Sequence, residues 1–211
     1  MAFTVFARRG YARASVQEIA DEAKAAKPTV YNHFGDKETL FRGAMAAAAD
    51  SVAAETFAAI EPLRDAGADV RATLGAAASG LLRICAGERS HALRSLAFAE
   101  LATFPELAVA MQERTSVHLT EALADRFARL ALSGALRPCD PDTAAEHFLA
   151  LLIGPLESRS RLGARTLPEK ELEGIAESAV DTFVRAYGSQ AGTPSLSKKD
   201  SPVPDSSQSS W

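Results

Sequence analysis

Apolar positions near the start of the chain recur every three or four residues, which is the spacing of one face of a helix. Val16, Ile19 and Ala20 form such a face. Ser15, directly before them, is a favourable N-cap residue because its hydroxyl can accept a free N–H of the first turn. We therefore predict a short helix that begins after Ser15 and ends near residues 24–26.

A second short helix is predicted over residues 29–34. Pro28 suits the first turn of a helix, where its missing N–H is not needed, and Gly35 is a favourable terminator. Asp36 then caps a third helix, which we expect to run to about Ile60. Two short helices joined by a tight turn and followed by a longer helix are typical of a helix-turn-helix unit.

Beyond this unit the pattern predicts long helices, and no segment shows the alternation of a strand. The predicted helices cover residues 69–86, 88–103 and 106–132, a helix opened by Asp140-Pro141, and a last helix opened by Pro168. The fold class is therefore all-α, with an N-terminal three-helix domain over residues 1–45 and a C-terminal helical bundle over 46–187. Residues 188–211 are rich in serine and proline, so we predict a disordered tail.

Charge is distributed unevenly along the chain. The whole sequence carries 23 basic and 27 acidic residues, a net charge of −4. Residues 1–45 carry seven basic and five acidic side chains, whereas the remainder carries 16 and 22. A basic head on an acidic body is consistent with contact to nucleic acid. No apolar run is long enough to span a membrane or to form a secretion signal, so we predict a cytoplasmic protein without membrane contact.

The short helix over residues 29–34 carries the polar groups expected of a DNA-reading helix. Its outward positions, together with the residue that precedes Pro28, are Lys27, Thr29, Tyr31, Asn32 and His33. Val30 and Phe34 are four residues apart and are expected to point inward. Polar side chains of a helix lying in the major groove reach base edges and phosphates, so this set predicts binding to double-stranded DNA.

The body offers few other candidates for chemistry. Its histidines have no metal-ligand spacing, and no nucleophile motif or phosphate-binding loop occurs, so we predict no metal site, no cofactor and no enzymatic activity. Cys85 and Cys139 leave a redox switch as an alternative.

The last two predicted helices carry apolar residues around more of their circumference than one core face needs. This excess predicts a four-helix interface with a second copy of the chain. The candidate interface residues are Phe148, Leu152, Leu156, Ile175, Ala179 and Phe183. Two-fold symmetry would place two recognition helices about one DNA turn apart, as a palindromic site requires.

Two series of residues, one near the start of the chain and one further along it, have the spacing of a known family. The first comprises Phe6, Gly10-Tyr11, Ser15-Val16, Ile19-Ala20, Ala23, Thr29-Val30-Tyr31, His33-Phe34, Lys37-Glu38 and Leu40. The second comprises Phe98, Glu100, Phe104-Pro105-Glu106-Leu107, Gly134, Leu136, Asp140-Pro141, Ala144-Ala145 and Phe148-Leu149. The first series resembles the head of the TetR family of one-component regulators. The second is similar to the AefR-like type of C-terminal domain in that family.

The resemblance implies roles for matching positions. Tyr31, His33 and Lys37 would hold DNA phosphates, and Lys27 and Thr29 would touch phosphates or base edges. The body would be a ligand-binding and dimerisation bundle, and the helix from Leu40 onward would connect it to the head. A pocket for a largely apolar small molecule would be lined by Phe98, Phe104, Met111, His118 and Phe148.

The sequence also departs from the family pattern. Lys24 stands where the family usually has a glycine in the turn, and Ala26 replaces the usual serine cap. Family members usually begin earlier, with a basic arm and the first turns of the first helix. Either such residues are missing before Met1, or the head makes fewer DNA contacts than usual.

The resulting hypothesis is a homodimeric, ligand-responsive DNA-binding regulator. In this hypothesis it acts as a repressor that a small molecule releases from a palindromic operator. The alternative is a helical, dimeric binding module whose DNA affinity is weak or lost.

Overall fold

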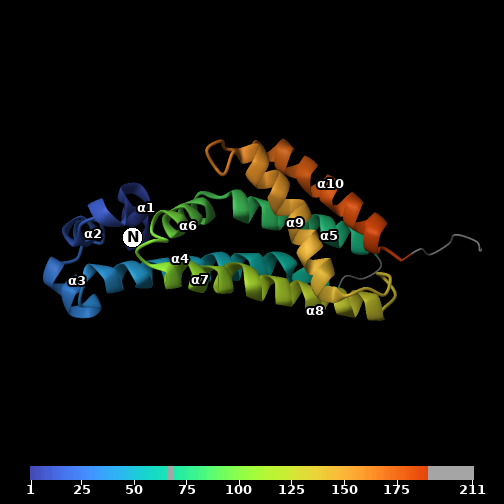
Figure 1. Cartoon of the computed structure of the whole chain (residues 1–211), viewed down its shortest axis with the longest axis horizontal. Helices are drawn as coiled ribbons and strands as arrows, with labels where there is room; N and C mark the ends of the chain where they lie inside the picture. The colour runs from blue at the N-terminus through green and yellow to red at the C-terminus, as the bar shows by residue number, and fades with distance from the viewer. Residues whose placement is uncertain (66–68, 190–211) are drawn as a thin grey trace, which may run out of the picture.

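The structure, a computed structural model, describes residues 1–65 and 69–189. Within these ranges the chain is helical, and the one extended feature is an isolated bridge between Leu136 and Gly188. The all-α prediction is therefore confirmed. Of the predicted tail, residues 190–211 lie outside the described residues. The helices form an elongated molecule with the first three helices at one end (Figure 1).

The head consists of three short helices and the start of a long one. These are α1 (Ala2–Arg13), α2 (Val16–Glu22), α3 (Lys27–Phe34) and α4 (Lys37–Ile60). The predicted caps are present, since the Ser15 hydroxyl accepts the Glu18 N–H at 3.1 Å and the Asp36 carboxylate accepts the Thr39 N–H at 2.7 Å. Gly35 ends α3 with a φ of 77°, a conformation that favours glycine.

The described part of the body follows as one short 3-10 helix, six α-helices and a π-helical turn. These are η1 (Glu61–Asp65), α5 (Val70–Ala86), α6 (Glu88–Ala99), α7 (Pro105–Gln112), η2 (Glu113–Val117), α8 (His118–Leu132), α9 (Pro141–Ser160) and α10 (Glu169–Tyr187). The helix predicted over 88–103 ends early, because residues 100–103 form a turn closed by the Phe104 N–H and the Glu100 carbonyl at 2.8 Å. The single helix predicted over 106–132 is present as three consecutive helical segments, because the π-helical turn η2 separates α7 from α8.

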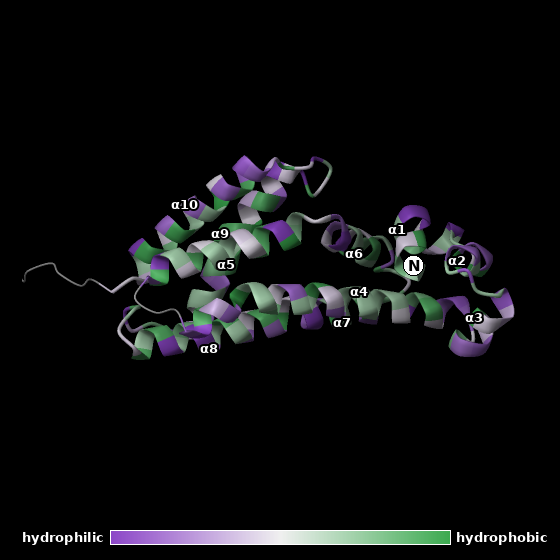
Figure 2. Ribbon diagram, turned by 180° about the vertical axis from the view of Figure 1, so that it is seen from behind, coloured by the Kyte–Doolittle hydropathy of each residue, from purple (hydrophilic) through white to green (hydrophobic). Residues whose placement is uncertain are grey.

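Two hydrophobic cores lie along the long axis. The body core joins α5, α8, α9 and α10 around Phe127, Phe148 and Phe183, whose ring centroids are 5.0–5.6 Å apart. The second, which we call the head core, joins α1, α2 and α4 to residues of α6 and α7. Figure 2 shows that the long helices carry both hydrophobic and hydrophilic positions along their length.

The boundary predicted at residue 45 falls inside both a helix and a core. The helix α4 crosses this position without a break. Met45, Ala48 and Val52 on one side of it are buried in the same head core as Leu93 and Leu96 of α6. The head and the body therefore share part of their hydrophobic interior.

A buried arginine holds the far end of α4. Arg126 of α8 is 5 % exposed, and its guanidinium donates to the carbonyls of Ile60 at 3.1 Å and Ala122 at 2.9 Å. It also pairs with the Glu61 carboxylate at 2.7 Å. The carbonyls at the end of a helix have no partners within the helix, so this side chain satisfies one of them inside the protein.

We expect Arg126→Ala to lower the free energy of unfolding by about 2–3 kcal/mol, because it removes the guanidinium donor of the Ile60 carbonyl and packed side-chain carbon. Urea unfolding followed by circular dichroism measures the change. Arg129→Ala is the matched control, since Arg129 is an exposed arginine of the same helix paired with Asp125. An equal effect of the two substitutions would contradict the role assigned to Arg126.

Candidate DNA-binding helix and body cavities

The helix α3 lies at the end of the molecule opposite α10 (Figure 1). The five side chains predicted for it to contact DNA are all exposed: Lys27, Thr29, Tyr31, Asn32 and His33. Val30 is 9 % exposed, and Phe34 is half-buried against the same core. The inward and outward faces of α3 therefore agree with the prediction, and the polar face is presented at the tip of the head.

The charge around α3 is partly neutralised within the head. Arg8 pairs with Glu18 and Glu22, and Arg9 pairs with Glu18. The hydrogen bonds from Arg8 and Arg9 lower the pKa of Glu18 below its ordinary value, which keeps that carboxylate charged. The helix α3 itself contains no acidic residue, and Lys27 Nζ lies 5.8 Å from the ring centre of Tyr31.

Lys37, unlike the other predicted DNA contacts, is half-buried and is held by partners within the protein. Its Nζ donates to the Ala12 carbonyl at 3.1 Å and lies 4.7 Å from the ring centre of Tyr11. The side chain thus ties the start of α4 to the end of α1. It has to leave these partners, or share its remaining N–H groups, to hold a phosphate.

The turn between α2 and α3 is strained at Lys24. Its φ is 52°, in the left-handed region that side chains disfavour. Here the family pattern has glycine, and the backbone geometry supplies the reason. Ala26 precedes α3 without a side-chain hydrogen bond, as expected for an alanine at the N-cap.

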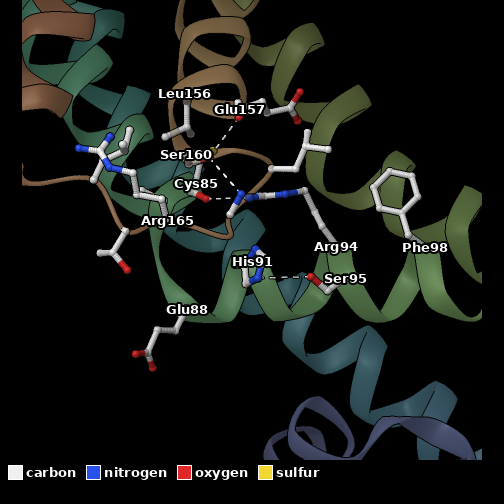
Figure 3. A pocket seen from close by; sticks show the side chains of 15 residues that line it. Cys85, Glu88, His91, Arg94, Ser95, Phe98, Leu156, Glu157, Ser160 and Arg165 are labelled. Atoms are coloured by element: carbon white, nitrogen blue, oxygen red, sulfur yellow. Dashed lines mark hydrogen bonds between the residues drawn. The ribbon is translucent and has the colours of Figure 1, made fainter.

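The body contains two adjacent cavities beside α6. The first, about 400 Å³, lies between the end of α5, α6, the end of α9 and the α9–α10 loop, and Figure 3 shows its lining side chains. The second, about 320 Å³, lies between α4, α5, α6, η2, α8 and α9. Four residues line both cavities: Cys85, Arg94, Leu156 and Glu157. Volumes of this size suit small-molecule ligands.

The predicted pocket residues lie mostly elsewhere. Phe98 lines the first cavity but is 75 % exposed at its edge. Phe104 and Met111 are buried in the head core, and Phe148 is buried in the body core. His118 is exposed on α8. Apolar spacing identifies residues that are buried but not which of them face a cavity, and this explains the difference.

Polar residues of the sequence would have predicted the lining of the cavities better than the apolar spacing. Arg94 directly follows the buried Leu93 on α6 and lines both cavities, and Thr115 and Ser116 stand in the π-helical turn η2, a kind of irregularity that is frequent at functional sites. Both cysteines are free thiols. Burial raises the pKa of the Cys85 thiol, which favours its neutral form.

The predicted interface residues are buried within one chain. Phe148, Leu152, Leu156, Ile175, Ala179 and Phe183 are each at most 3 % exposed and belong to the body core. The wide apolar stripes of α9 and α10 are used inside the chain, because α9 packs against α5, α8 and α10, and α10 packs against α5 and α9. These six side chains leave no surface for a partner chain in this arrangement.

A helix-turn-helix head whose polar helix is exposed, joined to a helical body with cavities, defines the class of one-component DNA-binding regulators. Two family descriptions match the chain. The AefR-like transcriptional repressor C-terminal domain matches residues 72–189, and the bacterial regulatory proteins of the tetR family match residues 1–44. The chain therefore belongs to the TetR family of transcriptional regulators, whose members bind DNA and are not enzymes.

Solved structures agree with this assignment. A TetR-family regulator from Mesorhizobium loti MAFF303099 is 30 % identical, with a TM-score of 0.81 over 89 % of this chain and 93 % of that one. The flavonoid-responsive regulator FrrA is 26 % identical, with a TM-score of 0.70 over 90 % and 94 %. A regulator from Pseudomonas syringae pv. tomato DC3000 is 26 % identical, with a TM-score of 0.62 over 89 % and 92 %. No curated protein sequence matches the chain.

We expect Lys24→Gly to raise the free energy of unfolding by about 0.5–1 kcal/mol. Glycine removes the strain of the positive φ, and this gain is larger than the loss caused by the greater entropy of the unfolded chain. Thermal unfolding measures the change. Lys27→Gly, which places glycine in the first turn of α3, is the control and should destabilise instead. A loss of stability in Lys24→Gly would show that the turn does not favour glycine.

Proposed function

We propose that the chain is a homodimeric transcriptional repressor that leaves a palindromic operator when a small, largely apolar molecule binds the body. In this proposal it acts in the cytoplasm, where its DNA is found. None of the described helices is long and apolar enough to cross a membrane.

The observation that carries the ligand response is the position of α6. Ser90, Leu93 and Arg94 of this helix line the second cavity. Leu93 and Leu96 of the same helix are buried in the head core with residues of α1 and α4. A ligand that moves α6 must therefore disturb the packing beneath the head, and a state that no longer fits the operator spacing is favoured by the ligand's binding energy.

The character of the second cavity supports an apolar effector. Leucine, isoleucine and valine side chains from five elements line it, with Val52, Leu81, Leu119, Leu149 and Ile153 among them. A few polar groups interrupt this lining, as in small-molecule sites generally. The similar regulator FrrA is described as flavonoid-responsive, and this supports the proposal that the present chain responds to a small molecule.

Dimer formation is proposed through the outward faces of α9 and α10. The inward faces are used by the body core, so a partner chain has to meet the exposed positions of these helices. Gly154 on α9 is exposed, and a Cβ built on it meets no atom within 4 Å. A dimer of this kind would carry two copies of α3, as a palindrome requires.

The alternative, a dimeric binding module with weak DNA affinity, finds some support in the pairing of Arg8 and Arg9 with acidic residues of the head. Fluorescence anisotropy with DNA flanking the chain's own gene, at several salt concentrations, decides between the two. The repressor predicts tight binding with a steep salt dependence, whereas binding no tighter than to unrelated DNA would favour the alternative.

Within α3, we expect Lys27→Ala and Tyr31→Phe to weaken binding to all DNA sequences alike. Lys27→Ala should also reduce the slope of log affinity against log salt by about one, because one phosphate contact is lost. Lys170→Ala, an exposed lysine at the start of α10, is the control and should leave the slope unchanged. Loss of affinity confined to one base position would contradict the assignment of these residues to phosphates.

For the dimer, we expect Gly154→Arg to yield a folded chain with the mass of a monomer, 22.3 kDa, in multi-angle light scattering. Arginine fits the open space at this position within one chain but blocks close approach of a second α9. Ala76→Arg, at an exposed position of α5, is the control and should stay dimeric. A dimeric Gly154→Arg variant would place the interface elsewhere.

A further inference from the structure

Arg94 occupies the position where the two cavities of the body meet. It stands on α6 and lines both of them (Figure 3). Its guanidinium is half-buried and donates to the Cys85 carbonyl in the last turn of α5 at 3.0 Å. This bond connects α5 to α6, the helix that packs beneath the head.

The guanidinium of Arg94 retains most of its hydrogen-bonding capacity. An arginine side chain has five N–H donors, and one bond to a protein acceptor is present here. Within residues 1–65 and 69–189, no carboxylate lies within 4 Å of it. Arg165, which also lines the first cavity, instead pairs with both carboxylate oxygens of Glu171. Arg94 is therefore a cation beside the cavities without an anionic partner.

The surroundings of Arg94 favour an anion joined to an apolar body. Leu93, Leu119 and Ile153 line the second cavity, so a charge-assisted hydrogen bond formed there is shielded from water and is stronger than at the surface. Phe98 and Leu162 stand at the edge of the first cavity, 75 % and 78 % exposed, and offer apolar surface to a ligand that extends outward. A guanidinium matches a carboxylate because two parallel N–H groups meet its two oxygens.

Two acidic residues oppose this arrangement and define a competing ligand. Glu88 lines the first cavity and Glu157 lines both, but each is exposed and lies more than 4 Å from the Arg94 guanidinium. A ligand bearing an ammonium group would be drawn to Glu88 or Glu157, whereas a carboxylate would be drawn to Arg94. The half-buried arginine is the stronger determinant, because water screens the exposed carboxylates more effectively.

We propose that the effector is an organic acid, with a carboxylate bound by Arg94 and an apolar chain or ring in the second cavity. This inference rests on the proposed function, since it specifies the chemical class of the small molecule. Because one N–H group of Arg94 also holds the Cys85 carbonyl in the last turn of α5, a carboxylate bound by the remaining N–H groups is connected through the guanidinium to α5. Binding of the acid is thereby coupled to the contact between α5 and α6.

The test is isothermal titration calorimetry of the full chain without DNA, using paired probes. Decanoate and cinnamate are the acids, decanamide and cinnamamide are their neutral counterparts, and decylammonium is the cationic probe. We expect at least one acid to bind at least about tenfold more tightly than its amide. Arg94→Gln should abolish this preference, and Arg94→Lys should retain part of it. Circular dichroism reports whether each variant is folded.

Arg89→Gln is the matched control, because Arg89 is on the same helix but pairs with Glu55 and lines neither cavity. It should keep the preference of the wild-type chain. Equal binding of acid and amide, tighter binding of decylammonium, or binding of none of the probes would overturn the proposal. The comparison of acid and amide on the wild-type chain decides the question even if an Arg94 variant does not fold.

Adding the bound acid to the complex with operator DNA separates this proposal from the proposed function. An acid that binds through Arg94 but does not release DNA would contradict the ligand-responsive repressor and leave the acid site intact. Release of DNA by a neutral compound that does not need Arg94 would support the repressor and overturn the acid site.

Discussion

The head and the body are held together by one hydrophobic core, and the rest of the architecture depends on it. The rings of Phe6, Tyr11 and Phe41 from α1 and α4 pack with Phe104 at the start of α7, at centroid distances of 4.9–5.7 Å between neighbouring rings. Arg42 reaches across the same junction, over the Phe104 ring and to Glu106. Close-packed interiors transmit displacement, so the head cannot change its angle without a response from α6 and α7.

This constraint gives a physical meaning to the position of the cavities. Both lie beside α6, and the second is lined by buried residues of both cores, Val52 and Leu93 of the head core and Leu81 and Leu119 of the body core among them. The body core keeps α5 and α8–α10 together whether or not a ligand is present. Two helices, α4 and α6, line the second cavity and also contribute to the head core, through Val52 and Leu93. In the proposed function, a small molecule would act on the head by changing how these helices pack, α6 in particular.

Much of the fold could be predicted from local signals. The caps at Ser15 and Asp36, the terminator Gly35, and the exposed polar face of α3 all follow from short-range chemistry that the sequence displays directly. The end of α6 at Ala99 was missed because the turn after it depends on backbone bonds that no residue type in that segment demands.

The cavities and the surface for a partner chain could not be predicted in the same way. A stripe of apolar residues predicts that a helix face is buried, but Phe148 and Phe183 show that the face can be filled entirely within the chain. Lys37 likewise matches the family pattern for a phosphate contact, yet its nearest acceptor in this structure is the Ala12 carbonyl. Which partner a side chain meets is decided by tertiary packing.

We infer that α6 and the head form one cooperative unit, and amide hydrogen exchange measures this coupling. Leu96 of α6 is 5 % exposed in the head core and lines neither cavity. In one cooperative unit, Leu96→Ala should lower the protection of amides in α1 and the first half of α4 by the same free energy as in α6 itself. Reduced protection confined to α6, with α1 and α4 unchanged, would contradict this inference.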